Sequence, residues 1–232
     1  MPHNVTLSVV LPSYMEEENL RQLLPRVMAV LSDLGVTFEV LVVDSMSPLD
    51  GSREVCEACG VTYLNRSGGN FYGDAVRTGI RHASGEFTLF MDADGSHPPE
   101  FIRNLWSSRD EGDVVIASRY IQGGATDNSR SLVLMSLLVN LIYALVLNLR
   151  CKDVSNSFKL YRTRCLKQLQ LRCRNFDVVE EILFKIRRAN PGVCFREIPF
   201  TFRKRMFGNT KRNLVTFVFS FIVTLLKLRF GR

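Results

Sequence analysis

The sequence lacks the features of a small secreted, repetitive or disordered protein. Its six cysteines show no regular framework of the kind found in disulfide-rich domains. It contains no internal repeat, no low-complexity linker and no cleavable signal peptide at its N-terminus. An apolar fraction of 46% excludes wholesale disorder. These absences predict a single folded domain of 232 residues in a reducing, cytoplasmic setting.

A second cysteine pair at metal-binding spacing is also missing. Cys56 and Cys59 lie three positions apart in a segment with helical character, and this spacing occurs in metal and redox sites. A four-cysteine zinc site needs another such pair, which the sequence does not contain. We therefore interpret the pair as ordinary helix packing.

Acidic residues are scarce in the last third of the chain. Residues 150–232 hold 20 Lys and Arg against 5 Asp and Glu, whereas residues 1–149 hold 10 against 18. The net charge of +7 therefore combines an acidic first part with a strongly basic last part. This asymmetry predicts that the last third faces phosphates, whether of a nucleic acid, lipid headgroups or a phosphorylated substrate.

The first half of the chain alternates between strand and helix patterns. Apolar, β-branched runs predict strands over residues 5–14, 38–44, 61–65, 87–94 and 113–120. The segments between them predict helices over residues 19–34, 52–59 and 73–83. This alternation indicates parallel β-α-β units with helices on both faces of the sheet. Ligands of such sheets bind beyond the carboxyl ends of the strands, where Pro12, Asp44, Asp92 and Asp94 should converge.

Two long apolar segments, residues 131–149 and 214–226, lie within basic surroundings. The first carries a polar stripe formed by Ser136, Asn140 and Tyr143. The second makes a helix of only about 20 Å, against a hydrocarbon core of roughly 30 Å. Neighbouring basic residues favour helices that lie on a membrane surface without spanning it. The alternative is that both are core helices of a soluble domain.

The stretch FTLFMDADGSHPPEF, residues 87–101, runs from an apolar strand directly into two carboxylates. Unpaired carboxylates in a dry site are costly, so Asp92 and Asp94 need a divalent metal, a cation from elsewhere in the chain, or solvent. His97 precedes two prolines that mark a helix start, and we interpret it as a loop residue, not as a base.

Six segments follow one another across nearly the whole chain: VVLPSYMEEENL, VLVVDSMSPLDGS, MDADGSHPPEFI, ASRYIQGG, DVSNSFKLYR and FRKRMFGNTKRN. Together they resemble the inverting glycosyltransferases of family 2, and within them the dolichol-phosphate mannose synthase group. The resemblance implies an α/β fold of the GT-A type, with helices on both faces of the sheet and C-terminal interfacial amphipathic helices. Residues 1–130 would form the nucleotide-sugar and metal-binding core. Residues 131–232 would form the acceptor-binding, membrane-associating part of the same catalytic domain.

The same resemblance assigns roles at the donor side of the site. Pro12, Tyr14 and Glu16 match the segment that cradles the base and ribose of a nucleotide sugar. Asp44 matches an acid that contacts the nucleoside. Asp92 and Asp94 match the motif that holds the diphosphate and a Mg²⁺ or Mn²⁺ ion. Alternating carboxylates at a strand-to-loop junction suit this task, because they place two oxygen ligands where the ion can bridge to phosphate oxygens.

Further residues match groups that hold the lipid phosphate and the donor diphosphate. Ser96 can add a metal or phosphate contact, and the cations Arg119, Arg205 and Lys211 are expected to converge within reach of Asp94. Arg205 is counted with the Asp pair as catalytic. A polyprenyl phosphate is already ionised near neutral pH, so no strong general base is required. Rate acceleration would come from positioning and from metal stabilisation of the departing nucleotide.

The expected reaction is transfer of a sugar, first of all mannose from GDP-mannose, to a dolichyl or undecaprenyl phosphate. The enzyme would act peripherally on the cytosolic face of a membrane, with a separate membrane subunit as a candidate partner. Met15, Ser45 and Leu49 depart from the family pattern in the nucleoside pocket, which keeps UDP-glucose or another UDP-sugar open as the donor. The alternative from another class is a non-catalytic basic module that binds membranes or nucleic acid. Such a module does not explain the Asp pair, and we expect no nucleic-acid partner.

Overall fold

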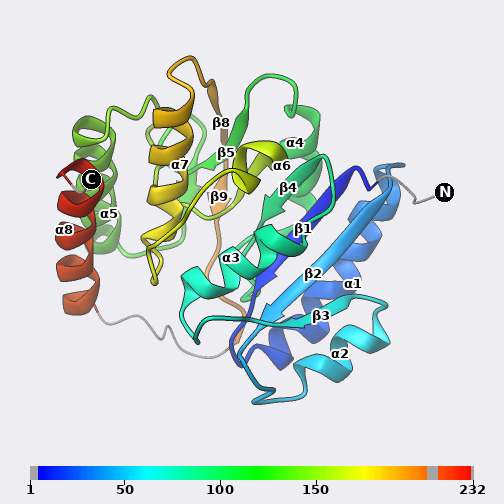
Figure 1. Ribbon diagram of the computed structural model, residues 1–232. Helices are drawn as coiled ribbons and strands as arrows, with labels where there is room; N and C mark the ends of the chain where they lie inside the picture. Colours follow the sequence, from blue (N-terminus) through cyan, green and yellow to red (C-terminus); the bar gives the residue numbers. More distant parts are fainter. Residues whose placement is uncertain (1–4, 208–213, 231–232) are drawn as a thin grey trace.

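A seven-stranded sheet forms the centre of the molecule (Figure 1). The computed structural model describes residues 5–207 and 214–230. The strands of the sheet are β1 Leu7–Pro12, β2 Phe38–Asp44, β3 Thr62–Asn65, β4 Phe87–Phe90, β5 Val114–Ser118, β7 Lys159–Arg162 and β8 Phe195–Pro199. A small second sheet pairs β6 Ala125–Thr126 with β9 Thr201–Phe202.

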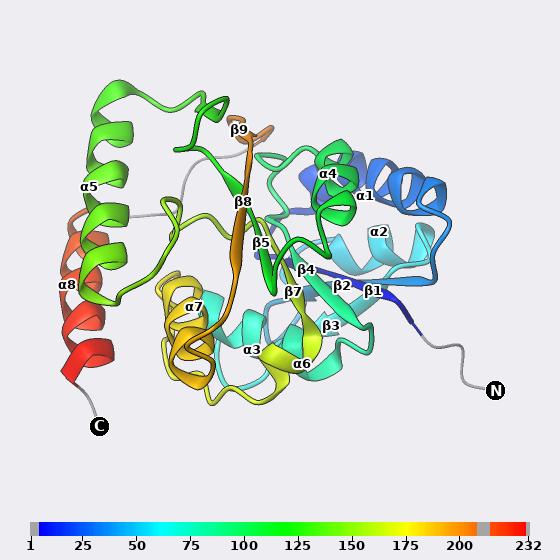
Figure 2. The same cartoon turned by 90° about the horizontal axis from the view of Figure 1, so that it is seen from above.

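Helices cover both faces of this sheet (Figure 2). One face carries α1 Glu17–Asp33, α2 Ser52–Ala58 and α4 Ile102–Ser107, the last preceded by the 3-10 turn η1 Pro99–Phe101. The other face carries α3 Tyr72–His82, α6 Thr163–Lys167 and α7 Val178–Ala189. Helices α5 Arg130–Val146 and α8 Leu214–Phe230 lie side by side at one end of the molecule (Figures 1 and 2). The predicted α/β architecture is confirmed.

Each face of the sheet has its own apolar core, because successive strand residues point to opposite faces. Val9 and Leu11 of β1 join the cluster beneath α1, α2 and α4, whereas Val10 joins the cluster beneath α3 and α7. Cys56 of α2 is fully buried in the first cluster, which agrees with the predicted role in helix packing.

The predicted strands run parallel, but the sheet also contains an antiparallel strand, β7, that the sequence pattern did not predict. The order is β3-β2-β1-β4-β7-β5-β8, and β7 runs antiparallel to both β4 and β5. The chain leaves the sheet after Ser118, passes through α5 and returns beside the same end of β5. There the Ala117 N–H donates to the Phe158 carbonyl at 3.1 Å. A strand that begins at the carboxyl ends of its neighbours must run against them.

The polar stripe of α5 faces the protein, and the apolar side of the helix is exposed. Asn140 and Tyr143 are each 1% exposed, whereas Leu134 and Leu145 are 70% and 71% exposed. The Asn140 amide accepts a hydrogen bond from the Ser155 N–H at 2.9 Å and donates to the Ser155 hydroxyl at 3.1 Å. This exchange ties α5 to the segment that leads into β7.

Helix α8 extends the second predicted apolar segment to Phe230 and packs on α5. The rings of Phe221 and Tyr143 meet edge to face at 4.6 Å, and the Thr224 hydroxyl donates to Asp177. Within the described ranges, the structure contains no helix with the length and apolarity needed to cross a membrane.

Candidate active site

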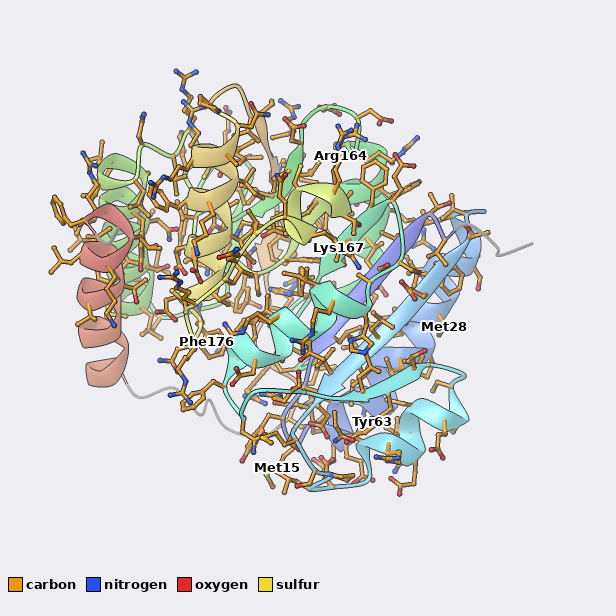
Figure 3. The ribbon with its side chains drawn as sticks, viewed as in Figure 1. Met15, Met28, Tyr63, Arg164, Lys167 and Phe176 are labelled. Carbon is orange, nitrogen blue, oxygen red and sulfur yellow. The ribbon has the colours of Figure 1, made fainter. Side chains whose placement is uncertain are left out.

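The carboxyl ends of β1, β2 and β4 bring the predicted donor-side residues to one edge of the sheet. Strand β1 lies between the other two, with Pro12 opposite Val43 of β2 and Val10 opposite Phe90 of β4. Pro12, Asp44, Asp92 and Asp94 therefore lie at or just beyond neighbouring strand ends, as the strand pattern predicts. Met15 and Tyr63 lie at this end of the molecule, whereas Arg164 and Lys167 of α6 lie toward the other (Figure 3).

Asp92 is held by hydrogen bonds to one of its two carboxylate oxygens. Its Oδ1 accepts from the Ser157 hydroxyl at 2.9 Å and from the Tyr72 hydroxyl at 3.3 Å. Tyr72 is itself stacked on Phe176 with ring centroids 4.3 Å apart. Burial, reinforced by the nearby Asp92 charge, raises the pKa of Tyr72 well above its usual value, so this hydroxyl remains a donor.

Asp94 stands at a tight turn that a glycine makes possible. Its Oδ1 accepts from the Ser96 N–H at 3.0 Å, and its backbone carbonyl accepts from the Met206 N–H at 2.9 Å. Gly95 has φ of +80°, and a Cβ there would lie 2.6 Å from atoms of Met206. The Ser96 hydroxyl is buried and has no hydrogen-bond partner among the described residues, which leaves it available to a ligand.

Asp92 and Asp94 fit a divalent cation. The hydrogen bonds among the described residues use Oδ1 of each carboxylate and not Oδ2, although Oδ2 of Asp92 lies 3.8 Å from His97 Nε2. No group of three or more His, Cys, Asp or Glu in the described ranges could hold a metal by itself. Magnesium is commonly bound by one or two carboxylates together with substrate phosphates and water, so two hard oxygen donors are sufficient.

His97 is a site residue that the sequence interpretation missed. Its ring is fully buried, stacked on Phe158 at 4.6 Å, and its Nδ1 lies 2.9 Å from the Asp92 backbone nitrogen. Burial lowers its pKa, which favours the neutral imidazole. The predicted helix start after it is confirmed, because η1 begins at Pro99. The two prolines after His97 are a local signal for the helix start, whereas the contact of His97 with Asp92 is visible only in the folded chain.

Asp44, the expected nucleoside contact, is the last residue of β2. It is fully buried, and its Oδ2 accepts from the Tyr63 hydroxyl at 3.0 Å. Its Oδ1 has no hydrogen-bond partner within the described part of the chain. Burial, reinforced by the Asp44 charge, raises the pKa of Tyr63 to about 12, so the phenol stays protonated. One carboxylate oxygen is thus left for a ligand.

Arg66 connects the loops around Asp44 by hydrogen bonds. The sequence interpretation did not identify this residue. Its guanidinium donates to the carbonyls of Asp44 at 2.9 Å, Asn70 and Phe71 at 3.1 Å each, and Ser13. It thereby links the ends of β1 and β2 to the loop before α3. A lone arginine after a short strand gives no local signal of such a role.

Met15 occupies a strained backbone position beside the pocket. It has φ of +55° and a side chain that is 50% exposed. The left-handed region costs most residues roughly 1–2 kcal/mol, and Asn is one of the few that tolerate it. We expect Met15→Asn to raise the free energy of unfolding by about 0.5–1 kcal/mol. Urea unfolding of this variant beside Met46→Asn, at a similarly exposed site, tests this, and equal effects at both positions would contradict the explanation.

Glu16 and Arg205 pair with each other across the donor edge. Arg205 Nη2 lies 2.9 and 3.0 Å from the two Glu16 oxygens, and Arg205 Nε donates to the Phe207 carbonyl at 2.7 Å. Asn19 reinforces the contact, accepting from the Phe207 N–H at 3.1 Å and donating to Glu16 at 2.5 Å. The basic segment 203–207 is thus held between α1 and the Asp94 turn.

Arg119 is engaged by a partner that the sequence interpretation did not identify. Its Nε and Nη2 donate to the two oxygens of Asp153 at 2.8 and 2.7 Å, and Nη2 also donates to the Ser155 hydroxyl at 3.0 Å. The Arg119 and Asp153 side chains are 9% and 0% exposed. Burial opposes the charge on Arg119, but the Asp153 carboxylate outweighs it and raises the pKa of Arg119. Nη1 makes none of these bonds.

The expected convergence of the three cations near Asp94 stays a prediction. Arg205 lies one residue before Met206, whose N–H bonds to Asp94, and Arg119 is fixed by Asp153. Lys211 lies outside the described residues. The phosphate-binding roles of all three stay predictions.

Comparison with known proteins identifies the family. A model described as "Glycosyl transferase family 2" matches residues 8–170, which include the Asp pair, Arg119 and Asp153. The chain belongs to glycosyl transferase family 2.

Two relatives are similar over most of this chain. The dolichol-phosphate mannosyltransferase of Pyrococcus furiosus is 32% identical over 212 residues, covering 88% of this chain but 58% of that protein. The chain thus spans less than two thirds of that relative. The undecaprenyl-phosphate mannosyltransferase of Micrococcus luteus is 30% identical over 217 residues, covering 87% of this chain and 85% of that protein.

Solved structures establish the fold of this family 2 chain. The glucosyl-3-phosphoglycerate synthase from Mycobacterium tuberculosis, crystallised with Mn²⁺, UDP and glucosyl-3-phosphoglycerate, superposes with a TM-score of 0.73. The two share 19% sequence identity over 97% of this chain and 80% of that one. Another structure of the same synthase contains Mg²⁺ and UDP. At this identity the likeness concerns the fold, and the predicted GT-A type is confirmed.

Proposed function

We propose that this protein transfers a hexosyl group from a nucleotide sugar to a polyprenyl phosphate with a divalent metal ion. The observation that carries the proposal is the Asp92–Asp94 turn, in which Oδ2 of each carboxylate accepts no hydrogen bond from the described residues, beside a buried Ser96 hydroxyl that also has no hydrogen-bond partner among them. Two relatives named for transfer of mannose to polyprenyl phosphates support the acceptor class. Mn²⁺ and Mg²⁺ in structures of the same fold support the cofactor.

The residues of this chain divide the work between donor and acceptor. Within residues 1–130, Asp44, Glu16 and the strand-end loops would bind the nucleoside. When bound, the metal would neutralise the departing diphosphate as a Lewis acid. Residues 131–232 would carry the acceptor side, with Arg205, Lys211 and Nη1 of Arg119 as donors to phosphate oxygens. The chain then needs to position an acceptor phosphate that is already ionised.

Mannose from GDP-mannose is the first candidate donor, because both named relatives are mannosyltransferases. One observation favours a UDP-sugar as the second candidate. The Tyr63 hydroxyl already donates to Asp44 Oδ2, whereas Oδ1 accepts no hydrogen bond from the described residues, and Ser45 donates its hydroxyl to the Ser47 carbonyl at 2.6 Å. A single acceptor suits the one N–H of uracil, whereas the adjacent N1–H and N2–H of guanine suit two carboxylate oxygens.

A turnover assay tests the reaction and the donor together. The protein would be supplied with Mg²⁺ or Mn²⁺, a short-chain polyprenyl phosphate and radiolabelled GDP-mannose or UDP-glucose in parallel. Labelled lipid from one donor, abolished by a metal chelator, is the expected result. Absence of labelled lipid from both donors, with the metal and nucleotide bound, would contradict the proposed acceptor.

The apolar surface of α5 and α8 is the proposed membrane contact. The exposed face of α5 carries Leu134, Leu137, Leu138, Leu141 and Leu145, and α8 adds Leu226 and Phe230. Exposed Lys227 and Arg229 on α8 supply positive charge near this face. An apolar helix face flanked by basic residues is typical of peripheral binding to anionic lipid. We therefore propose peripheral attachment at the cytosolic face, with a separate membrane subunit as a further candidate partner.

Replacing Leu134, Leu138 and Leu141 together with Gln tests this surface. Full burial of one Leu is worth about 1.5–3 kcal/mol, so we expect binding to vesicles with anionic lipid to fall at least about tenfold. Stability should change by under about 0.5 kcal/mol per site, because these side chains are exposed. Vesicle flotation measures the loss. Leu49→Gln, at an exposed site beyond β2, is the control, and an equal loss in it would contradict the assigned surface.

A further inference from the structure

His97 lies at the centre of a hydrogen-bonded chain that ends on Asp92. The Asp92 N–H donates to His97 Nδ1 at 2.9 Å, and His97 Nε2 lies 3.2 Å from the Asn156 amide oxygen. The Asn156 amide nitrogen then donates to the Ala117 carbonyl of β5 at 2.6 Å. The side chains of His97 and Asn156 are buried. Strand β5 is thus connected to the backbone of the first metal-binding carboxylate.

The direction of these bonds follows from the groups at the two ends. A backbone N–H can only donate, so Nδ1 must accept and Nε2 must carry the proton. A backbone carbonyl can only accept, so the Asn156 nitrogen must face Ala117 and its oxygen must face His97. Each group in this hydrogen-bonded series can therefore act in only one way, as donor or as acceptor at each bond. Asn156 thereby fixes the tautomer of the His97 ring.

The ring is also prevented from turning. Phe158 stacks on it at an interplanar angle of 11°, and Phe200 and Phe202 meet it edge-on with centroids 5.8 and 5.6 Å away. A ring clamped on three sides places its Nδ1 at one point. The backbone of Asp92 is therefore held by a rigid acceptor.

We propose that His97 is a positioning residue for the metal ligand Asp92, and that Asn156 sets the tautomer through which it acts. Ser157 and Tyr72 hold Asp92 at Oδ1 and His97 holds it at its backbone N–H, while Oδ2, 3.8 Å from His97 Nε2, takes part in none of these hydrogen bonds. The inference rests on the proposed metal-dependent function. It adds that the ion's affinity is set partly by an imidazole that never touches it.

Two substitutions at His97 separate positioning from packing. In His97→Asn the amide oxygen can occupy the place of Nδ1 and still accept from the Asp92 N–H. In His97→Gln the amide reaches only to the place of Nε2, so the bond to Asp92 is lost. Both variants lose the aromatic stack, and their thermal unfolding temperatures give the size of that common effect.

The measurement is Mn²⁺ affinity by electron paramagnetic resonance, with UDP or GDP present and no acceptor. We expect His97→Gln and Asn156→Ala to bind Mn²⁺ about 10- to 100-fold more weakly than the wild type, and His97→Asn to lie within about threefold of it. Equal weakening in His97→Asn and His97→Gln, or unchanged affinity in all three, would overturn the proposal.

A spectroscopic signature of the wild type keeps the proposal testable even if the variants fail to fold. The chain has three histidines, so the ¹⁵N resonances of the His97 ring can be assigned. A protonated Nε2 with an unprotonated Nδ1 is expected, and the opposite tautomer would overturn the proposal. Neither the Mn²⁺ affinity nor the His97 resonances depend on sugar transfer. A wild-type protein that binds Mn²⁺ but transfers no labelled sugar to lipid would therefore contradict the proposed reaction and not this inference.

Discussion

Asp94→Asn is expected to reduce turnover at least about a hundredfold while the protein stays folded. The substitution keeps the shape of the side chain and the oxygen that accepts from the Ser96 N–H, but removes the negative charge that would bind the cation. The side chain is partly exposed, so the cost to the free energy of unfolding should remain within about 0.5 kcal/mol. The loss of turnover would therefore come from weaker metal binding and weaker stabilisation of the departing diphosphate.

Asp33→Asn is the matched control for this experiment. Asp33 forms an ion pair with Arg103 at 2.7 Å, and its side chain is 66% exposed at the far end of α1. Initial rates with saturating donor and a series of Mn²⁺ concentrations would be compared for both variants. Excess Mn²⁺ should recover part of the activity of Asp94→Asn. Near-normal rates in Asp94→Asn at low Mn²⁺ would show that the Asp pair is not the metal site.

The strand ends of the donor side could be predicted from the sequence because each signal is local. Buried parallel strands are continuous apolar runs, and a polar residue or proline directly after such a run marks the ligand-binding edge of the sheet. Pro12, Asp44 and the Asp92–Asp94 pair all follow this rule. The antiparallel strand β7 could not be predicted by this rule. Its direction depends on the end of the sheet at which the chain returns after α5, and no local sequence pattern indicates that end.

Buried side chains that bind distant parts of the chain could not be predicted. Arg66 reaches carbonyls up to 53 positions away, and His97 meets Asn156 at a separation of 59 positions. Nothing in their local sequence distinguishes them from a surface arginine or a loop histidine. Such residues become recognisable only when the loops they connect are in place.

The two sides of α5 illustrate a different limit. Periodicity correctly groups Ser136, Asn140 and Tyr143 on one stripe, but it does not say which side of the helix faces the protein. Lipid and protein core are both apolar, so a helix between them has two apolar surroundings. Here the polar stripe faces inward because Asn140 exchanges two hydrogen bonds with Ser155. The leucines are left outside.

Arg119 was predicted as a phosphate-binding cation, and its pairing with Asp153 changes what its substitution should do. Asp153 accepts from the Arg119 backbone N–H, from its Nε and Nη2, and from the Asn156 N–H at 3.2 Å. Glu197 in turn accepts from the Asp153 N–H at 2.9 Å. The ion pair thus holds the segment between α5 and β7 against the end of β5. A role for Arg119 at a phosphate would be added to this structural one.

Asp153→Asn is expected to lower the free energy of unfolding by about 3–5 kcal/mol. The reason is that the Arg119 charge would stay buried without a counter-ion, while Asn can still accept one of its hydrogen bonds. Chemical unfolding in urea measures the loss. The double variant Asp153→Asn with Arg119→Leu removes the unpaired charge, so it should be more stable than the single variant even though it has fewer polar contacts. A double variant that is less stable than Asp153→Asn would mean that the hydrogen bonds of Arg119, and not the balance of buried charge, hold this segment in place.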